Sequence, residues 1–129
     1  MLNSQCTIGR HDLKTDNLIV EKSKMFALRI IKLYKYLCSE KNENILSKQI
    51  MRSGTSIGAN VREATRAQSK ADFNAKISIA LKEAEETAYW LELLFESDFL
   101  EKEAYDSIYT DCSEICKILM SISKTGREG

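Results

Sequence analysis

The chain has 129 residues, of which 43% are apolar and 29% are charged, a composition typical of a single soluble globular domain. This length argues against a multi-domain enzyme. The chain contains five glycines and no proline, so it has few of the residues that end strands at tight turns. Long helices are therefore the predicted elements.

The formal charge of zero, from 19 basic and 19 acidic side chains, conceals an uneven distribution. Residues 1–43 carry a net charge of +3, residues 44–70 carry +4, and residues 71–129 carry −7. A basic face is therefore compatible with the neutral total, and an anionic partner is not excluded by it.

No segment has the pattern of a membrane span or a secretion signal. A membrane span needs about 18–20 apolar residues without charges, and lysine, arginine or glutamate interrupts every candidate stretch. Residues 1–15 lack the apolar core of a signal peptide. We expect a cytoplasmic protein whose four cysteines are reduced.

Residues 1–15 show no sustained hydrophobic period and are predicted to form a flexible N-terminal extension. A helix is predicted from Asp16, with Asp16 or Asn17 as its cap. Its apolar residues recur at about 100° per residue and define one buried face. This face consists of Ile19, Phe26, Ile30, Leu33 and Leu37. A polar turn follows at residues 39–44.

The second predicted helix has small residues in its middle. Asn42 or Asn44 can cap its start, and its buried face consists of Leu46, Ile50, Ser53, Ile57, Val61 and Ala64. Gly54 and Gly58 each cost up to about 1 kcal/mol of helix propensity relative to alanine. We therefore expect a close helix crossing here, within the bundle or between subunits, because small residues let another backbone approach.

A short link at residues 68–71 leads to a third helix. Its apolar stripe consists of Phe73, Ile77, Ala80, Ala84, Ala88, Leu91 and Phe95. After a turn at residues 97–100, the stripe of a fourth helix consists of Tyr105, Ile108, Cys112, Ile115, Cys116 and Leu119. This helix is expected to fray before Gly126, leaving residues 124–129 as a flexible tail. Four helices joined by short links predict an all-α, antiparallel up-and-down four-helix bundle over residues 16–123.

The candidate catalytic and metal-ligating residues do not form a recognisable site. His11, the only histidine, lies in the predicted extension, so a nucleophile–base pair or a di-iron centre cannot be assembled. Cys112 and Cys116 lie four residues apart, unlike zinc-binding Cys-x-x-Cys pairs, and they continue an apolar stripe. We therefore expect buried apolar cysteines and not a metal site shared with Cys38. The acidic residues of the third helix are predicted to face water and not to act as an acid/base pair. They are Glu83, Glu85, Glu86, Glu92 and Glu96. We expect no enzyme activity, metal or cofactor.

A row of basic side chains follows the outward face of the second helix. Lys48, Arg52, Arg62 and Arg66 project within about 80° of one another, opposite the buried stripe, and Lys70 extends the row. The planar arginine fork suits phosphate, so the row is a candidate nucleic-acid-binding site. The alternative is a solvated helix face without a binding role.

Apolar side chains on the third helix exceed what one bundle needs. Ile79, Trp90 and Leu93 project away from the buried stripe of that helix. An exposed cluster of this kind favours a protein interface, and we expect self-association through it. The competing function is a protein-interaction adaptor or scaffold whose partner docks on this surface, with no role in binding nucleic acid.

Residues 49–64 read QIMRSGTSIGANVREA and resemble the Arg-Ser-x-x-Ser-Ile-x-x-Asn-Ile-x-Glu-Gly segment of a bacterial four-helix-bundle family. Its founding members are encoded in intervening sequences of large-subunit ribosomal RNA genes. The third helix is also similar to that of the family, and the resemblance covers about residues 16–122. Its polar positions fall on Arg52, Ser56, Asn60 and Glu63. The chain departs from the pattern at Val61, where the family has isoleucine, and at Ala64, where it has glycine.

The resemblance implies an oligomeric helical bundle with a nucleic-acid role. The family includes the accessory variability protein of diversity-generating retroelements, a ring-shaped homopentamer that associates with a reverse transcriptase and RNA. By resemblance, we expect a homo-oligomer, as a pentamer, whose partners are RNA or DNA or a nucleic-acid enzyme such as a reverse transcriptase. Ser56 and Asn60 are expected to form hydrogen bonds across the close helix crossing, or Arg52 and Arg62 to face a partner.

Overall fold

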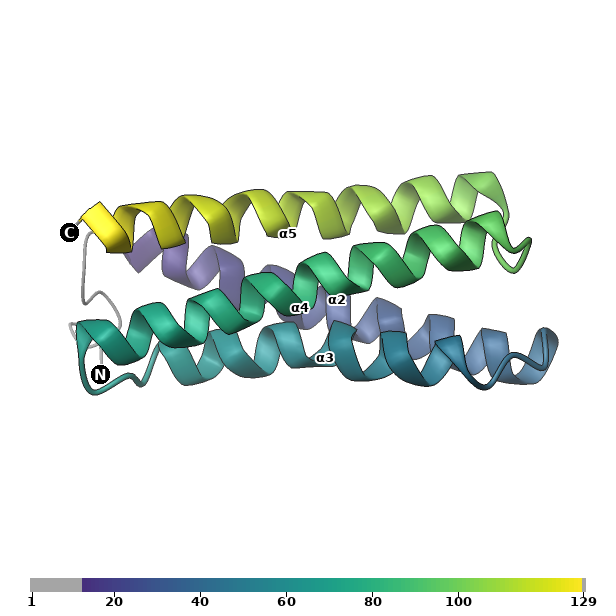
Figure 1. Ribbon diagram of the computed structural model, residues 1–129, viewed down its shortest axis with the longest axis horizontal. Helices are drawn as coiled ribbons and strands as arrows, with labels where there is room; N and C mark the ends of the chain where they lie inside the picture. The colour runs from purple at the N-terminus through teal and green to yellow at the C-terminus, as the bar shows by residue number, and fades with distance from the viewer. Residues whose placement is uncertain (1–12, 129) are drawn as a thin grey trace.

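The computed structural model describes residues 13–128, which form four helices and no strand. These helices are α2 (Leu13–Glu40), α3 (Leu46–Ala64), α4 (Lys70–Glu96) and α5 (Lys102–Glu128). Successive helices run in opposite directions along one long axis (Figure 1). The predicted all-α, up-and-down four-helix bundle is thus confirmed.

Two helix ends lie outside the expected boundaries. α2 begins at Leu13 and not at Asp16, so Asp16 is a buried residue of its first turn and not a cap. α5 continues to Glu128, where a flexible tail was expected. Its buried face extends past Leu119 to Ile122 and Gly126, and the Asn74 side-chain amide donates a hydrogen bond to the Gly126 carbonyl at 3.5 Å. The rest of the expected N-terminal extension, residues 1–12, lies outside the described residues.

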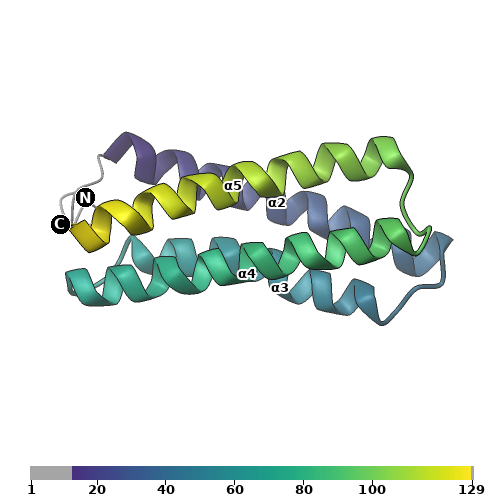
Figure 2. The ribbon, with the colours of Figure 1, turned by 45° about the horizontal axis from the view of Figure 1, so that its top comes forward.

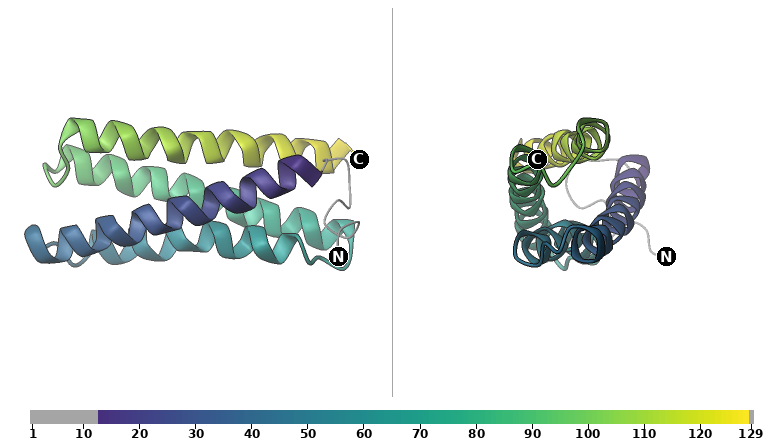
Figure 3. Two further views of the ribbon diagram at one scale, coloured as in Figure 1. Left: turned by 180° about the vertical axis from the view of Figure 1, so that it is seen from behind. Right: turned by 90° about the vertical axis from the view of Figure 1, so that its right-hand side faces the viewer.

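The four helices occupy the corners of a square in chain order (Figure 3). α3 and α4 share the most extensive packing, α2 packs on α3, and α4 packs on α5. α2 and α5 make much less contact, and α2 runs obliquely across the bundle (Figures 2 and 3). The bundle is consequently closed along three seams and more open along the fourth.

The core contains most residues of the apolar stripes that hydrophobic periodicity predicts, but at the end of α4 Leu94 is buried in place of the expected Phe95, which is half-buried. Its largest fully buried side chains are Ile19, Phe26, Ile30, Leu37, Ile50, Ile57, Phe73, Ile77, Leu91, Leu94, Ile115 and Leu119. Alanines at positions 80 and 84 of α4 are also completely buried, so the neighbouring helices approach its backbone closely.

The close crossing expected at the second helix lies within the bundle, between α2 and α3. A Cβ atom at Gly54 would meet the side chain of Ile30 at 2.8 Å, so only glycine fits there without rearrangement. A Cβ at Gly58 would lie 3.4 Å from the Ser23 hydroxyl, close to ordinary contact. The low helix propensity of Gly54 is therefore offset by the close packing of Ile30.

A buried glutamate, and not Asn42 or Asn44, caps the start of α3. The Glu43 carboxylate accepts hydrogen bonds from the backbone N–H groups of Leu46 at 2.9 Å and Ser47 at 2.7 Å. These bonds satisfy donors that have no partner within the helix, and the negative charge suits the helix N-terminus. Asn42 instead adopts a left-handed conformation, with φ of 55°, in the turn before it. Ser69 caps α4 by accepting a bond from Asp72 N–H at 3.0 Å.

Candidate nucleic-acid interface

Three members of the predicted basic row lie along α3 and in the turn that follows it. Lys48, Arg62 and Arg66 are exposed, with Arg66 two residues beyond the end of the helix. Lys48 and Arg62 fall within about 40° of each other around the axis of α3. None of the three forms an ion pair with another described residue, so their positive charges are not offset by a bonded carboxylate.

Arg52 is engaged with α4 and does not extend this row as an unpaired cation. Its guanidinium donates to the Glu83 carboxylate at 3.2 Å and also to Glu86. The Trp90 indole N–H donates to the same Glu86 oxygen at 2.9 Å. The hydrogen bond to Glu86 raises the pKa of Arg52, and the bond from Trp90 is the main reason that the pKa of Glu86 is lowered. Arg52 therefore links α3 to α4, although half of its side-chain surface is exposed.

Lys70 lies on a different helix from the rest of the predicted row. It is the first residue of α4 and is half-buried. The row cannot continue along one helix to this position because α3 ends at Ala64 and the chain turns before α4. Lys70 remains at the same end of the bundle as Arg66.

α2 contributes two basic residues that the analysis of the sequence did not single out. Lys24 and Arg62 line a hollow of about 200 Å³ between α2 and α3, beside Gly58 and Ala59. Lys35 lies eleven residues after Lys24, so it projects from nearly the same side of α2, about 16 Å further along the axis. Both lysines are exposed and form no ion pair within the described part of the chain. The eleven-residue spacing of these two lysines is visible in the sequence. It indicates a shared basic face only once the structure shows that α2 lies beside α3.

Three carboxylates of α2, α3 and the turn between them are bonded elsewhere or lie on other sides of α2. Glu63 forms an ion pair with Lys76 of α4, with 3.0 Å between the charged groups. Glu43 caps the start of α3. Glu21 lines hollows on other sides of α2. Helices α2 and α3 carry nine basic and four acidic residues, whereas α4 and α5 carry seven and eleven. We refer to the exposed cations Lys24, Lys35, Lys48, Arg62 and Arg66 as the α2–α3 basic face.

The remaining family-motif residues have structural roles near this face. Ser56 donates to the Arg52 carbonyl at 2.7 Å, and the Asn60 side-chain amide donates to the Ser56 carbonyl at 2.9 Å. Both hydrogen bonds stay within α3, so the expected bonds across the crossing are wrong for these two residues. A buried hydrogen bond between α3 and α4 is instead made by the Thr87 hydroxyl, which donates to the Ser53 hydroxyl at 2.8 Å. It lies on the α4 side of α3, whereas the close crossing faces α2.

The predicted apolar surface on α4 is only partly exposed. Ile79 is 41% exposed, but Trp90 and Leu93 are half-buried, and Trp90 packs against the core while its N–H is bonded to Glu86. Tyr89, which the sequence analysis did not include, is 53% exposed and lies 5.4 Å from Trp90 between ring centroids. Ile79 and Tyr89 are thus the most accessible apolar side chains of α4.

The three cysteines within residues 13–128 lie at two separate places in the bundle. Cys112 and Cys116 share the α4-facing side of α5, where Cys112 donates to the Ala84 carbonyl at 3.3 Å. Hydrogen bonding to Cys116 and burial raise the pKa of the Cys112 thiol, and the pKa of Cys116 is lowered by the same bond. Cys38 lies beside Ser47 instead. Among the described residues, no three histidine, cysteine or acidic side chains are grouped as metal ligands would be.

No helix within residues 13–128 combines the length and hydrophobicity required to cross a membrane. His11 lies outside the described residues.

The chain is similar to known proteins over nearly its whole length. Residues 15–121 match the family described as 23S rRNA-intervening sequence protein. A crystal structure from Bacteroides thetaiotaomicron, described as a protein of unknown function from the S23 ribosomal protein family, is 58% identical. The match covers 86% of this chain and 99% of that chain with a TM-score of 0.85. No curated protein matches this chain.

Proposed function

Because the chain belongs to the family of 23S rRNA-intervening sequence proteins, we propose that it is a non-enzymatic oligomeric protein that binds RNA or DNA. Binding takes place through the sugar–phosphate backbone on the α2–α3 basic face. The observation that carries this proposal is the presence of five exposed cations without a bonded carboxylate on two adjacent helices and the turn after α3. The proposal includes a cytoplasmic location and, as a partner, a nucleic-acid enzyme such as a reverse transcriptase.

The chemistry of the face suits backbone binding without sequence readout. Lysine and arginine donate charge-assisted hydrogen bonds to phosphate oxygens, and each phosphate they neutralise releases counterions. The face has no exposed aromatic side chain between its cations, so it lacks the stacking platform that single-stranded bases use. A structured or double-helical nucleic acid is therefore the expected ligand.

The binding test is fluorescence anisotropy with a structured RNA over a salt series. We expect the double variant Arg62→Glu/Arg66→Glu to bind at least tenfold more weakly at low salt, because two phosphate contacts become repulsive. Its slope of log affinity against log salt should fall by about 0.7–0.9 for each phosphate that the variant no longer neutralises. The matched control is Lys117→Glu/Lys124→Glu, which makes the same change of charge at exposed positions of α5. No binding by the parent, or equally weakened binding by both double variants, would contradict the proposed site.

The oligomer is proposed to assemble through Ile79, Trp90 and Leu93, with Tyr89 beside them. The exposure of Ile79 and Tyr89 supports this position, and it equally supports the alternative of a protein-interaction adaptor. Light scattering should show a mass of several subunits for the parent and a lower mass for Ile79→Glu. Met120→Glu on α5 is the control because Met120 is similarly exposed, at 48% against 41%. If the parent has the mass of one subunit, the proposed oligomer is contradicted and the protein-interaction adaptor becomes the favoured function of this surface.

A further inference from the structure

A groove with an apolar floor runs between α2 and α5, on a side of the bundle not used by the proposed nucleic-acid interface. It contains two hollows of about 320 and 590 Å³, both of which Arg29 lines. The two hollows are therefore consecutive along one seam. This is the seam with the least helix–helix contact, and its two hollows reach down to side chains of the buried core.

The floor is made by core side chains and the α2 rim by exposed apolar ones. The side chains beneath the two hollows are Phe26, Leu33, Leu100, Ile108 and Ile115. Met25, which is 59% exposed, and Tyr36, which is 39% exposed, stand on the α2 side. A phosphate backbone gains nothing from such a floor, whereas an apolar stripe of a protein helix would be removed from water there.

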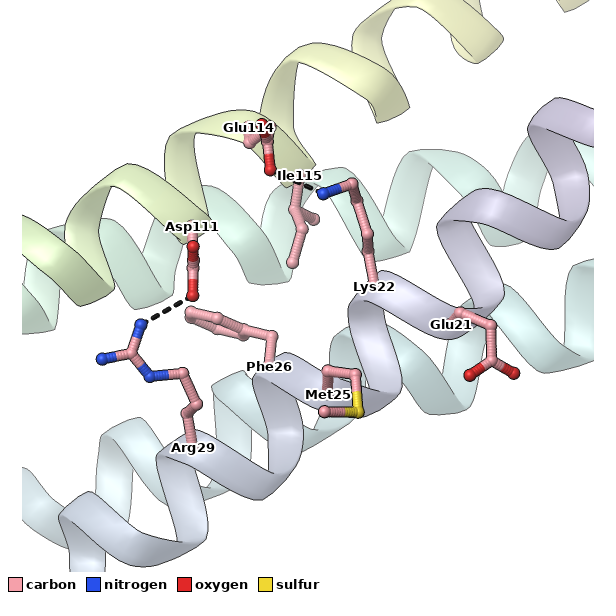
Figure 4. Close-up of a pocket in the computed structure, with 8 residues that line it drawn as sticks. All are labelled: Glu21, Lys22, Met25, Phe26, Arg29, Asp111, Glu114 and Ile115. Atoms are coloured by element: carbon pink, nitrogen blue, oxygen red, sulfur yellow. Dashed lines mark hydrogen bonds and ion pairs between the residues drawn. The ribbon is translucent and has the colours of Figure 1, made fainter.

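The two rims of the groove carry opposite charges. Lys22, Arg29 and Lys32 line the α2 rim, and Glu101, Asp111 and Glu114 line the other rim, at and before α5. Glu21 also lines the smaller hollow from α2, but its carboxylate points away from α5 (Figure 4), so the α2 rim is basic on balance. Ion pairs cross the groove at two points, between Lys22 and Glu114 at 2.7 Å and between Arg29 and Asp111 at 2.6 Å (Figure 4). All four side chains remain more than one third exposed, so they can exchange these bonds for bonds to a partner.

We propose that this groove binds one amphipathic α-helix of a partner protein. The apolar stripe of that helix lies on the floor, its acidic edge faces the α2 rim, and its basic edge faces the α5 rim. Lys22 and Tyr36 are 14 residues apart, or about 21 Å along α2, so about four turns of the partner fill the groove. A nucleic acid does not fit the apolar floor or the acidic rim.

The opposite rims also determine the direction of the bound helix. Turning a helix end for end in the groove, with its apolar stripe kept on the floor, exchanges its left and right edges. In that orientation the acidic edge would face Asp111 and Glu114, and the basic edge would face Lys22 and Arg29. Repulsion of like charges on both edges disfavours this orientation, so the partner binds in one direction only.

The probe for this site is a synthetic amphipathic peptide of about 18 residues, with a leucine stripe, glutamates along one edge and lysines along the other. Binding is followed by fluorescence anisotropy at low salt. We expect measurable affinity for the parent and affinity at least tenfold weaker for Ala104→Trp, because Ala104 is an exposed α5 residue lining the larger hollow. A second peptide with glutamates along both edges should bind more weakly than the first, since one edge would meet the acidic rim.

A pair of exposed α2 residues supplies a control that does not depend on filling the hollow. Met25→Gln removes an apolar group at the groove and should weaken binding several-fold. Leu28→Gln changes a residue of similar exposure, 47% against 59%, that lines neither hollow, and it should bind as the parent does. Circular dichroism confirms that each variant is folded.

Three outcomes would overturn the proposal. The first is that the parent does not bind the peptide. The second is that the parent, Met25→Gln and Ala104→Trp bind it equally well. The third is that Ala104→Trp has a lower oligomer mass while the parent binds no peptide. The last would assign the groove to a second copy of the chain. RNA binding is measured separately on these variants and should not change. The proposal for the groove and the proposal for the α2–α3 basic face are therefore tested independently.

Discussion

The two sides of α2 are packed in different ways. Toward α3, Gly54 leaves room for the Ile30 side chain, and the two helices meet through completely buried residues. Toward α5, exposed ion pairs span a groove whose floor is apolar. The α2–α3 seam therefore contributes mainly to the stability of the bundle, while the α2–α5 seam leaves apolar surface for a partner.

The largest expected difference between the seams comes from truncating one apolar residue on each side of α2. Ile30→Ala should lower the free energy of unfolding by about 2–5 kcal/mol, because it leaves a cavity beside Gly54 in a closed part of the core. Leu33→Ala, at the groove, should cost less, about 1–2 kcal/mol, since Leu33 is half-buried. Urea unfolding followed by circular dichroism measures both. Equal destabilisation by the two substitutions would contradict the difference in packing.

The two glycines of α3 should respond to alanine with opposite signs. Gly54→Ala forces Ile30 or the backbone to move, and overpacking of this kind costs about 1–3 kcal/mol, against up to about 1 kcal/mol gained in helix propensity. Gly58→Ala meets no such obstacle and should stabilise the protein by up to about 1 kcal/mol. Thermal and urea unfolding of both variants test this. A gain in stability for Gly54→Ala would show that the crossing is looser than described.

The ion pairs across the groove should contribute little to stability. Lys22→Gln and Arg29→Gln should each lower the free energy of unfolding by less than about 1 kcal/mol, because both pairs are exposed to water. The destabilisation should shrink as salt is added. Unfolding at low and high salt provides the measurement. A destabilisation that is large and independent of salt would mean that these pairs hold the seam closed.

The α4–α5 seam contains a polar interaction whose effect depends on pH. The Tyr109 hydroxyl donates to Glu92 at 2.9 Å, and this bond raises the pKa of Tyr109 from 10 to about 12. The folded state holds this proton more tightly than the unfolded state does. The bond therefore stabilises the fold fully below pH 10, and this stabilisation disappears as the pH rises through about 12.

Tyr109→Phe should remove this part of the alkaline fall in stability. The measurement is the free energy of unfolding at a series of pH values above neutrality. Tyr89→Phe is the matched control, since the exposed Tyr89 hydroxyl donates to no carboxylate in the described structure. Identical alkaline profiles for Tyr109→Phe and the parent would contradict the role of the bond.

Hydrophobic periodicity was sufficient to predict the four helices, their order and much of the core. The stripe at Ile19, Phe26 and Ile30 and the crossing at Gly54 follow from residues near one another in the sequence. Glu43 was missed as a cap because glutamate is not among the usual capping residues. Its buried carboxylate reaches the helix start only through the turn formed at Asn42.

The basic residues illustrate what local sequence patterns can and cannot predict. Their positions on one face of α3 followed from helix geometry, which depends on sequence spacing alone. Which cations remain unpaired depends on charges brought close by folding: Glu83, 31 residues after Arg52, pairs with it, and Lys24, 38 residues before Arg62, lies beside it. The sequence thus determined the helices and the face of each that is buried, because those properties arise within a few turns. Only the tertiary structure decided which charges meet and which seam stays open, because both depend on contacts between distant segments.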